Sequence, residues 1–207
     1  MLTPKYNYFA KRFWDWYIHR IIHSDFLEIR VEHPVYLHPN KSLLVLSNHF
    51  SWWDGFITWQ VNRTHFHKKY HVMMLEDQLR KNSFLRTAGA FSIDRSNMRK
   101  AVESLNYAAK LLEEPTNMVL MFPQGQIESQ HVKKPTFKSG VVRIARKVKN
   151  PFQVLFCFHW IDYLSDRKPT IYTYLKDYEG PLELESLQNA FYRYYTHSKQ
   201  EQSKLIS

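Results

Sequence analysis

A histidine and a carboxylate stand close together in the segment Asn48–Asp54. His49 precedes Asp54 by five positions, and both follow the short apolar run Leu43–Ser47. An imidazole titrates near neutral pH and can take a proton from a hydroxyl, while a carboxylate fixes its tautomer and stabilises the imidazolium that forms. We therefore interpret His49 as a candidate general base and Asp54 as the residue that orients it.

The spacing of this pair restricts how the two side chains can meet. In one straight helix, residues five positions apart point roughly 140° away from each other. The contact therefore requires His49 in a turn, with Asp54 folding back under it from the start of a helix. The structural alternative is that Asn48 or Ser51 caps this helix, Asp54 sits favourably in its first turn and His49 is merely exposed.

Two further segments, residues 89–95 and residues 122–125, lie at the ends of short apolar runs. Arg95 belongs to the first segment, and a guanidinium of this kind can clamp a phosphate or a carboxylate through two parallel hydrogen bonds. Pairing of Arg95 with Asp94 or another surface carboxylate is the structural alternative. In the second segment Gly125 follows Pro123 at the end of a predicted strand, where backbone amides can open toward an anion. A plain strand end is the structural alternative there.

Taken in order, the three segments resemble the motifs of the glycerophospholipid acyltransferase superfamily. Its best-known members acylate glycerol-3-phosphate or 1-acylglycerol-3-phosphate. The first motif, N-H-x-x-x-x-D, is matched by Asn48, His49 and Asp54. The second, G-x-x-x-I-D-R, is matched by Gly89, Ile93, Asp94 and Arg95. The third, F-P-E-G-T-R-S, is matched in part by Phe122, Pro123 and Gly125.

The resemblance implies an O-acyltransferase that moves a fatty acyl group from acyl-CoA or acyl carrier protein to a hydroxyl of a (lyso)lipid. His49 would be the base and Asp54 its partner, and transfer would be direct, without an acyl-enzyme or a resident cofactor. No Gly-x-Ser-x-Gly motif, typical of α/β-hydrolases, occurs in the sequence. The acceptor would be held by Arg95 and by a loop of five residues: Phe122, Pro123, Gln124, Gly125 and Gln126.

The third motif departs from the superfamily pattern at two positions. Gln124 replaces the glutamate and loses its charge, and Ile127 stands where an arginine is usual. Either another cation replaces that arginine, or the acceptor carries no phosphate. The candidate replacements are Lys133, Lys134, Lys138 and Arg143. A catalytically weak or inactive lipid-binding homologue is the alternative function, and a basic nucleic-acid-binding protein is a more distant one.

Charge and aromatic content indicate the partners. The chain of 207 residues has a formal net charge of +10 and 16% aromatic residues, which favours anionic partners. A membrane surface fits better than nucleic acid, because no nucleic-acid-binding motif accompanies the charge. We expect no nucleic acid as a partner. No metal is expected either, because His65, His67 and His71 lack a nearby set of carboxylates.

The compartment is inferred from cysteine usage and the lack of long apolar runs. Cys157 is the single cysteine and lies in an apolar run, which suits a buried structural thiol in a reducing compartment. No signal peptide is visible, and no apolar run approaches the roughly 18 residues of a spanning helix. We therefore expect a peripheral or monotopic protein at the cytoplasmic face of a membrane.

The first 26 residues show the spacing of an amphipathic helix. Its aromatic and aliphatic stripe opposes Lys and Arg, which is typical of a helix at a membrane interface. A helix that packs on the core would give the same stripe. The members of the stripe are Tyr6, Phe9, Phe13, Tyr17 and Ile21, widened by Trp16, Ile18 and Ile22.

Strands and helices are predicted to alternate along the rest of the chain. This order predicts a three-layer α/β domain, and the resemblance implies a glycerol-3-phosphate acyltransferase-like fold with a central, mostly buried mixed sheet. We expect an N-terminal membrane-interface helix (1–26) followed by the acyltransferase domain (27–207). Strands are predicted at 26–36, 43–47, 71–75, 90–93, 117–122, 154–159 and 170–175. Helices are predicted at 54–61, 78–87, from a cap at Ser96 through Leu112, 139–149 and 184–195.

Overall fold

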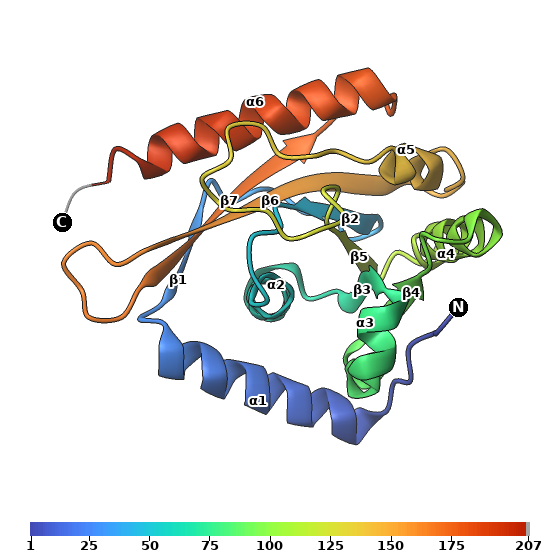
Figure 1. Ribbon diagram of the computed structural model, residues 1–207, viewed down its shortest axis with the longest axis horizontal. Helices are drawn as coiled ribbons and strands as arrows, with labels where there is room; N and C mark the ends of the chain where they lie inside the picture. Colours follow the sequence, from blue (N-terminus) through green and yellow to red (C-terminus); the bar gives the residue numbers. More distant parts are fainter. Residues whose placement is uncertain (206–207) are drawn as a thin grey trace.

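A seven-stranded mixed sheet separates two layers of helices (Figure 1). The computed structural model describes residues 1–205. The strand order is β1-β7-β6-β2-β5-β3-β4, in which β6 and β7 pair antiparallel and every other neighbouring pair is parallel. The strands are β1 (Ile29–Glu32), β2 (Ser42–Ser47), β3 (Lys69–Leu75), β4 (Ala90–Ile93), β5 (Asn117–Met121), β6 (Phe152–Asp162) and β7 (Thr170–Tyr178).

Alternation of side chains along the central strand creates two separate cores. All six residues of β2 are buried, because helices cover both faces of the sheet. Leu44 and Leu46 face the core under α4 (Met98–Leu111), α5 (Gly140–Ala145) and α6 (Leu184–Gln202). Leu43 and Val45 face the other core, which is covered by α1 (Tyr8–Asp25), α2 (Asp54–Val61) and α3 (Glu76–Lys81). The predicted three-layer fold with a buried mixed sheet is confirmed.

Helix α1 packs on this second core through a narrow stripe. Trp14, Ile18 and Ile22, four residues apart, are buried, as expected for one face of a helix. The predicted stripe is thus divided: Ile18 and Ile22 are buried, whereas Phe9 and Phe13 are exposed to 81% and 52%. Within residues 1–205, no helix combines the length and the apolar character needed to cross a bilayer.

Several element boundaries differ from the predictions because polar contacts decide them. Helix α4 is capped by Asn97, whose side chain accepts from the amide of Lys100, while the Ser96 hydroxyl is bonded to Asp94. The predicted helix 78–87 is divided into α3 and a 3₁₀ turn, η2 (Ser83–Ala88), because Asn82 leaves the helical conformation. A π-helical turn, η1 (Asn62–Phe66), extends α2.

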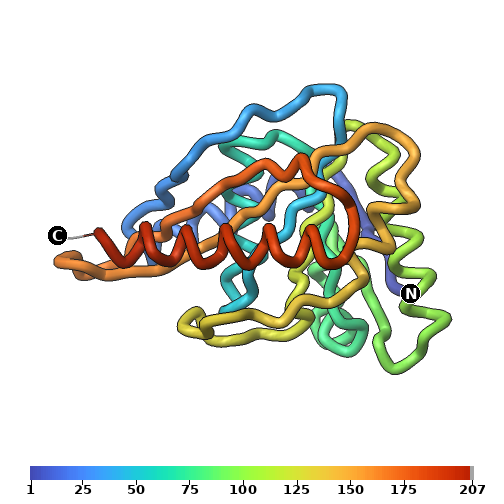
Figure 2. The backbone as a smooth tube through the Cα atoms, turned by 90° about the horizontal axis from the view of Figure 1, so that it is seen from above, coloured from blue at the N-terminus to red at the C-terminus, as the bar shows by residue number. Residues whose placement is uncertain are grey.

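Two helices in the second half of the chain also end at residues other than those predicted. Helix α5 ends at Ala145, four residues before the predicted end at Lys149. Helix α6 continues to Gln202, seven residues beyond the predicted end at Tyr195. Its last turns are held on the sheet by Trp160, which donates to Ser198, and by Tyr174, which donates to Gln202. Figure 2 shows α6 lying lengthwise over the sheet, with the segment 126–139 running beside it.

Candidate active site

His49 and Asp54 meet at the carboxyl end of β2. The turn after this strand carries His49, and Asp54 is the first residue of α2. His49 Nδ1 lies 2.7 Å from Asp54 Oδ2. The same oxygen accepts from the backbone amides of Phe50 at 2.8 Å and Ser51 at 3.0 Å. The same carboxylate therefore closes the turn and contacts the imidazole. Asp54 thus folds back under His49, as the spacing of the two residues requires.

Burial dominates the electrostatics of this pair. Asp54 is fully buried, and burial raises the pKa of its carboxyl group despite the hydrogen bonds from His49, Ser51 and Phe50 that favour the charged form. Its Oδ1 atom has no hydrogen-bond partner among the described residues. The negative charge of Asp54 is thus compensated on the side that faces His49.

The imidazole is fixed from a second direction by an aromatic ring. The rings of His49 and Phe122 are stacked, with centroids 4.1 Å apart and an angle of 17° between planes. The His49 side chain is 23% exposed. Since Nδ1 is engaged by Asp54, Nε2 is the ring nitrogen without a partner in the described part of the chain. A base held in this way has one nitrogen available for a proton.

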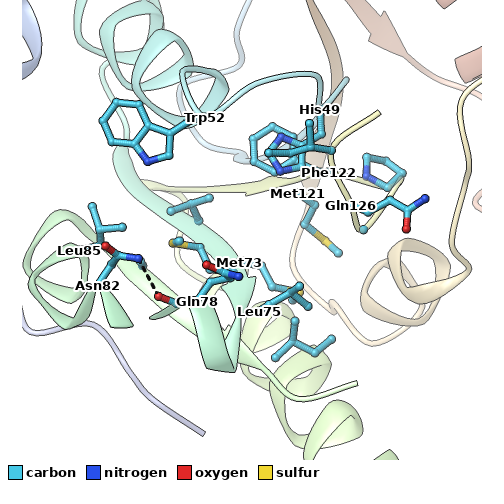
Figure 3. Close-up of a pocket in the computed structure, with 18 of the residues that line it drawn as sticks. His49, Trp52, Met73, Leu75, Gln78, Asn82, Leu85, Met121, Phe122 and Gln126 are labelled. Carbon is cyan, nitrogen blue, oxygen red and sulfur yellow. Dashed lines mark hydrogen bonds between the residues drawn. The ribbon is translucent and has the colours of Figure 1, made fainter. Parts of the chain in front are cut away.

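The pair borders a deep apolar cavity of about 550 Å³. Figure 3 shows His49 and Phe122 on one side of it, with apolar side chains from several elements around the rest. The cavity lies within the size range of small-molecule sites and is lined mainly by hydrophobic groups. Its apolar lining includes Trp52, Met73, Leu75, Leu85 and Met121, and its polar lining His49, Gln78, Asn82, Arg95, Gln126 and Lys138.

The third-motif loop contributes to the cavity with four of its five predicted residues. Phe122, Pro123, Gly125 and Gln126 line it, whereas Gln124 does not. Gln124 is buried, and its Oε1 accepts from the backbone amide of His49 at 2.6 Å. The motif predicts Gln124 against the acceptor, but the structure places it against the backbone of His49, outside the described lining of the cavity.

Two cations meet beside Gly125 at the wall of the cavity. Gly125 has a φ of +69°, and a Cβ atom there would lie 2.8 Å from Arg95 Nη1 and 3.6 Å from Lys138 Cγ. Arg95 and Lys138 are exposed, and neither side chain has a hydrogen bond or ion pair to another described residue. Asp94 pairs with Lys100 at 3.2 Å, so the structural alternative for Arg95 is not realised.

Only Lys138 of the four candidate replacement cations lines the cavity within the described residues. The ammonium group of Lys134 lies 4.7 Å from the centre of the Tyr192 ring, outside the cavity. Lys133 and Arg143 are absent from the described lining. Of the four candidate cations that the sequence could not distinguish, the fold therefore brings Lys138 to the cavity wall.

Asn48 has a structural role that the sequence did not reveal. Its side chain donates to the carbonyl of His159 and accepts from the amide of His159, both at 2.9 Å. The His159 ring is buried and reaches Thr58 in α2, with Nε2 2.9 Å from Oγ1. These contacts fasten the turn and α2 to β6, and therefore fix both members of the His49–Asp54 pair.

Other reactive groups lie apart from this site. Cys157 is buried in β6, and burial raises the pKa of its thiol, as in a structural cysteine. His71 is buried, with Nδ1 3.1 Å from the hydroxyl of Tyr6. In residues 1–205, no three His, Cys, Asp or Glu side chains are grouped so that they could hold a metal ion.

The family model described as Acyltransferase matches residues 28–158, and the chain belongs to this family. The resemblance to the glycerophospholipid acyltransferase superfamily is thereby confirmed.

A solved structure shares this fold. The crystal structure of the 1-acyl-sn-glycerophosphate (LPA) acyltransferase PlsC from Thermotoga maritima superposes with a TM-score of 0.55. The sequence identity is 19%, and the match covers 95% of this chain and 78% of that one. No curated protein sequence matches this chain.

Proposed function

We propose that the protein transfers a fatty acyl group from a thioester, acyl-CoA or acyl carrier protein, to a hydroxyl of a (lyso)lipid. The observation that carries this proposal is the His49–Asp54 contact of 2.7 Å at the edge of the apolar cavity. Membership of the acyltransferase family supports the reaction type. The cavity gives an acyl chain an apolar environment next to the base.

The proposed reaction is a direct transfer. His49 Nε2 takes the proton of the acceptor hydroxyl, and the resulting oxygen attacks the thioester carbonyl. Asp54 stabilises the imidazolium through Nδ1. Collapse of the tetrahedral intermediate breaks the carbon–sulfur bond, and the imidazolium returns its proton to the thiolate.

The acceptor is proposed to carry an anionic group, as in a lysophospholipid. Arg95 and Lys138 offer two cations beside Gly125 that no described carboxylate neutralises. A phosphate can bind both through charge-assisted hydrogen bonds. The name of the Thermotoga protein, an acyltransferase for 1-acyl-sn-glycerophosphate, agrees with this acceptor class.

This proposal is tested with two acceptors and two variants. The purified protein is incubated with palmitoyl-CoA or palmitoyl-acyl carrier protein and either lysophosphatidic acid or monoacylglycerol. We expect transfer to lysophosphatidic acid, and a KM raised about tenfold by Lys138→Gln or Arg95→Gln, since a hydrogen bond to a charged group contributes about 1.5–3 kcal/mol. Lys133→Gln, outside the described lining, is the matched control.

The other outcomes are equally informative. Preference for monoacylglycerol would contradict the anionic acceptor while leaving the transferase intact. Binding of lysophosphatidic acid without any acyl transfer would favour the inactive lipid-binding homologue.

We also propose that α1 holds the enzyme at the cytoplasmic face of a membrane. Phe9, Phe13 and Trp16 are exposed on one side of this helix, and Arg12 and Arg20 are exposed among them. Aromatic rings prefer the boundary of the headgroups, and arginines pair with lipid phosphates. A lipid substrate would then reach the cavity from the same surface.

A further inference from the structure

One side chain of the third-motif loop joins this loop to the backbone of the candidate base. Gln124 is 2% exposed. Its Oε1 accepts from the His49 amide at 2.6 Å, and its Nε2 donates to the His49 carbonyl at 3.2 Å. Both polar groups of one peptide segment are therefore held by a single buried amide. A carboxylate at this position would accept the first bond but supply no donor for the second.

Glu128 completes this contact from the other side. Its Oε2 accepts from Gln124 Nε2 at 3.0 Å and from the Thr136 amide at 3.0 Å. Its own backbone amide donates to the His49 carbonyl at 2.9 Å. Burial acts to raise the pKa of Glu128, but hydrogen bonds from Thr136, Gln124 and Gln126 outweigh it and lower the pKa. The carboxylate is therefore charged at neutral pH and requires a donor at position 124.

We propose that Gln124 and Glu128 form a matched amide–carboxylate pair that positions His49, with Glu128 supplying the carboxylate that the superfamily motif carries at position 124. This inference rests on the proposed function of His49 as the base. A glutamate at position 124 would face Glu128 across the 3.0 Å now spanned by a hydrogen bond. Two carboxylates at this distance repel, and the contact that holds His49 opens.

The pair acts on the base and not on the substrates. Gln124 does not line the described part of the cavity. The 2.7 Å bond to Asp54 and the stacking on Phe122 both depend on where the backbone of His49 stands. A small displacement of this backbone misplaces Nε2, which lowers kcat and leaves KM nearly unchanged.

The test is a charge exchange between the two positions. Gln124→Glu, Glu128→Gln and the double variant are assayed with palmitoyl-CoA and lysophosphatidic acid. We expect Gln124→Glu to lower kcat about tenfold at pH 8, with KM changed by less than about twofold. In the double variant the amide and the carboxylate face each other again, and the backbone amide of residue 128 still donates to the His49 carbonyl. We therefore expect kcat to recover to within about threefold of the parent protein. Gln200→Glu, which adds the same charge at an exposed site on α6, is the control.

The pH dependence separates positioning from a general disturbance of the fold. In Gln124→Glu the two neighbouring carboxylates repel, which raises the pKa of one of them. At lower pH that carboxyl is protonated, and its O–H can donate to the other carboxylate as the amide of Gln124 does in the parent protein. The ratio of the variant's kcat to that of the parent should therefore rise as the pH falls from 8 to 6. A ratio that is constant with pH, an unaffected Gln124→Glu or a double variant no better than Gln124→Glu would overturn the proposal.

A second measurement does not depend on catalysis. Amide hydrogen exchange of His49, followed by NMR, should be faster in Gln124→Glu and slow again in the double variant. If the parent protein transfers no acyl group, the proposed function fails while this exchange pattern still tests the pair. If Gln124→Glu does not fold, the proposal predicts that the double variant with Glu128→Gln folds again. A double variant that also fails to fold would contradict the pairing.

Discussion

At the scale of single residues, the site depends on atoms that have more than one partner. Asp54 Oδ2 contacts the imidazole of His49 and two backbone amides of the turn. The carboxylate thus builds the turn that presents the base. A buried group with several partners fixes geometry more tightly than an exposed one, because water does not compete for its hydrogen bonds. This is why the imidazole of His49 has a defined orientation although it stands in a loop.

The first prediction concerns the base itself. His49→Gln keeps a polar group near Asp54 but removes the nitrogen that takes the proton. We expect kcat to fall about 10²–10⁴-fold, the usual contribution of a general base, with an unchanged thermal midpoint. His131→Gln, at an exposed position, is the matched control and should leave kcat unaltered. Unchanged turnover in His49→Gln would exclude the mechanism.

The second prediction concerns Gly125 and is tested by Gly125→Ala. The left-handed backbone at φ +69° costs a residue with a side chain about 1–2 kcal/mol, and the new methyl group would lie 2.8 Å from Arg95 Nη1. We expect lower stability in urea unfolding and a raised KM for the acceptor as Arg95 is displaced. Gln200→Ala, at an exposed site of α6, serves as the control. An unaltered KM would show that Arg95 does not hold the acceptor.

At the scale of elements, α1 divides its side chains between two environments. Trp14, Ile18 and Ile22 belong to the core, whereas Phe9 and Trp16 point to solvent with 81% and 58% exposure. Large aromatic side chains exposed together on one helix face are typical of an interaction surface. The helix is therefore both a cover for the sheet and a candidate membrane contact.

The third prediction tests that contact. Phe9→Ser combined with Trp16→Ser removes two exposed rings without touching the buried stripe. We expect sedimentation with vesicles containing anionic lipid to fall about tenfold or more, since burying each ring contributes about 1.5–3 kcal/mol. Tyr163→Ser, which removes a ring of 60% exposure beyond the end of β6, is the control. Equal vesicle binding by the double variant and the parent would remove α1 from the membrane proposal.

At the scale of the whole molecule, two buried histidines couple stability to pH. Burial lowers the pKa of His71 to about 4 and that of His159 to about 3, because a charged imidazole is poorly solvated there. In the unfolded chain a histidine titrates near pH 6.5. Between these values the unfolded state binds more protons than the folded state, so the free energy of unfolding falls as the pH falls.

The fourth prediction follows from the direction of this pH dependence. From pH 7 to pH 5 the free energy of unfolding should fall by on the order of 2 kcal/mol for each buried histidine, measured by urea titration. His159→Gln should remove about half of this pH dependence, although the variant is less stable at pH 7. Gln200→Ala, which alters an exposed side chain without a titratable group, should leave the dependence unaltered. Equal unfolding free energies at the two pH values would contradict the buried, neutral state of both rings.

From its motifs and hydrophobic pattern alone, the chain could be assigned to its family and to an alternation of strands and helices, and His49, Asp54 and Arg95 could be named as candidate site residues. These signals are local, since a strand, a helix or a motif lies within a short stretch of chain. The packing of distant elements is what brings Gln124 to the backbone of His49 across 75 positions and Asn48 to His159 across 111. It also selected Lys138 among four cations and turned Trp14 inward on α1. Such contacts depend on how distant elements pack, and the spacing of residues along the chain carries no measure of that distance.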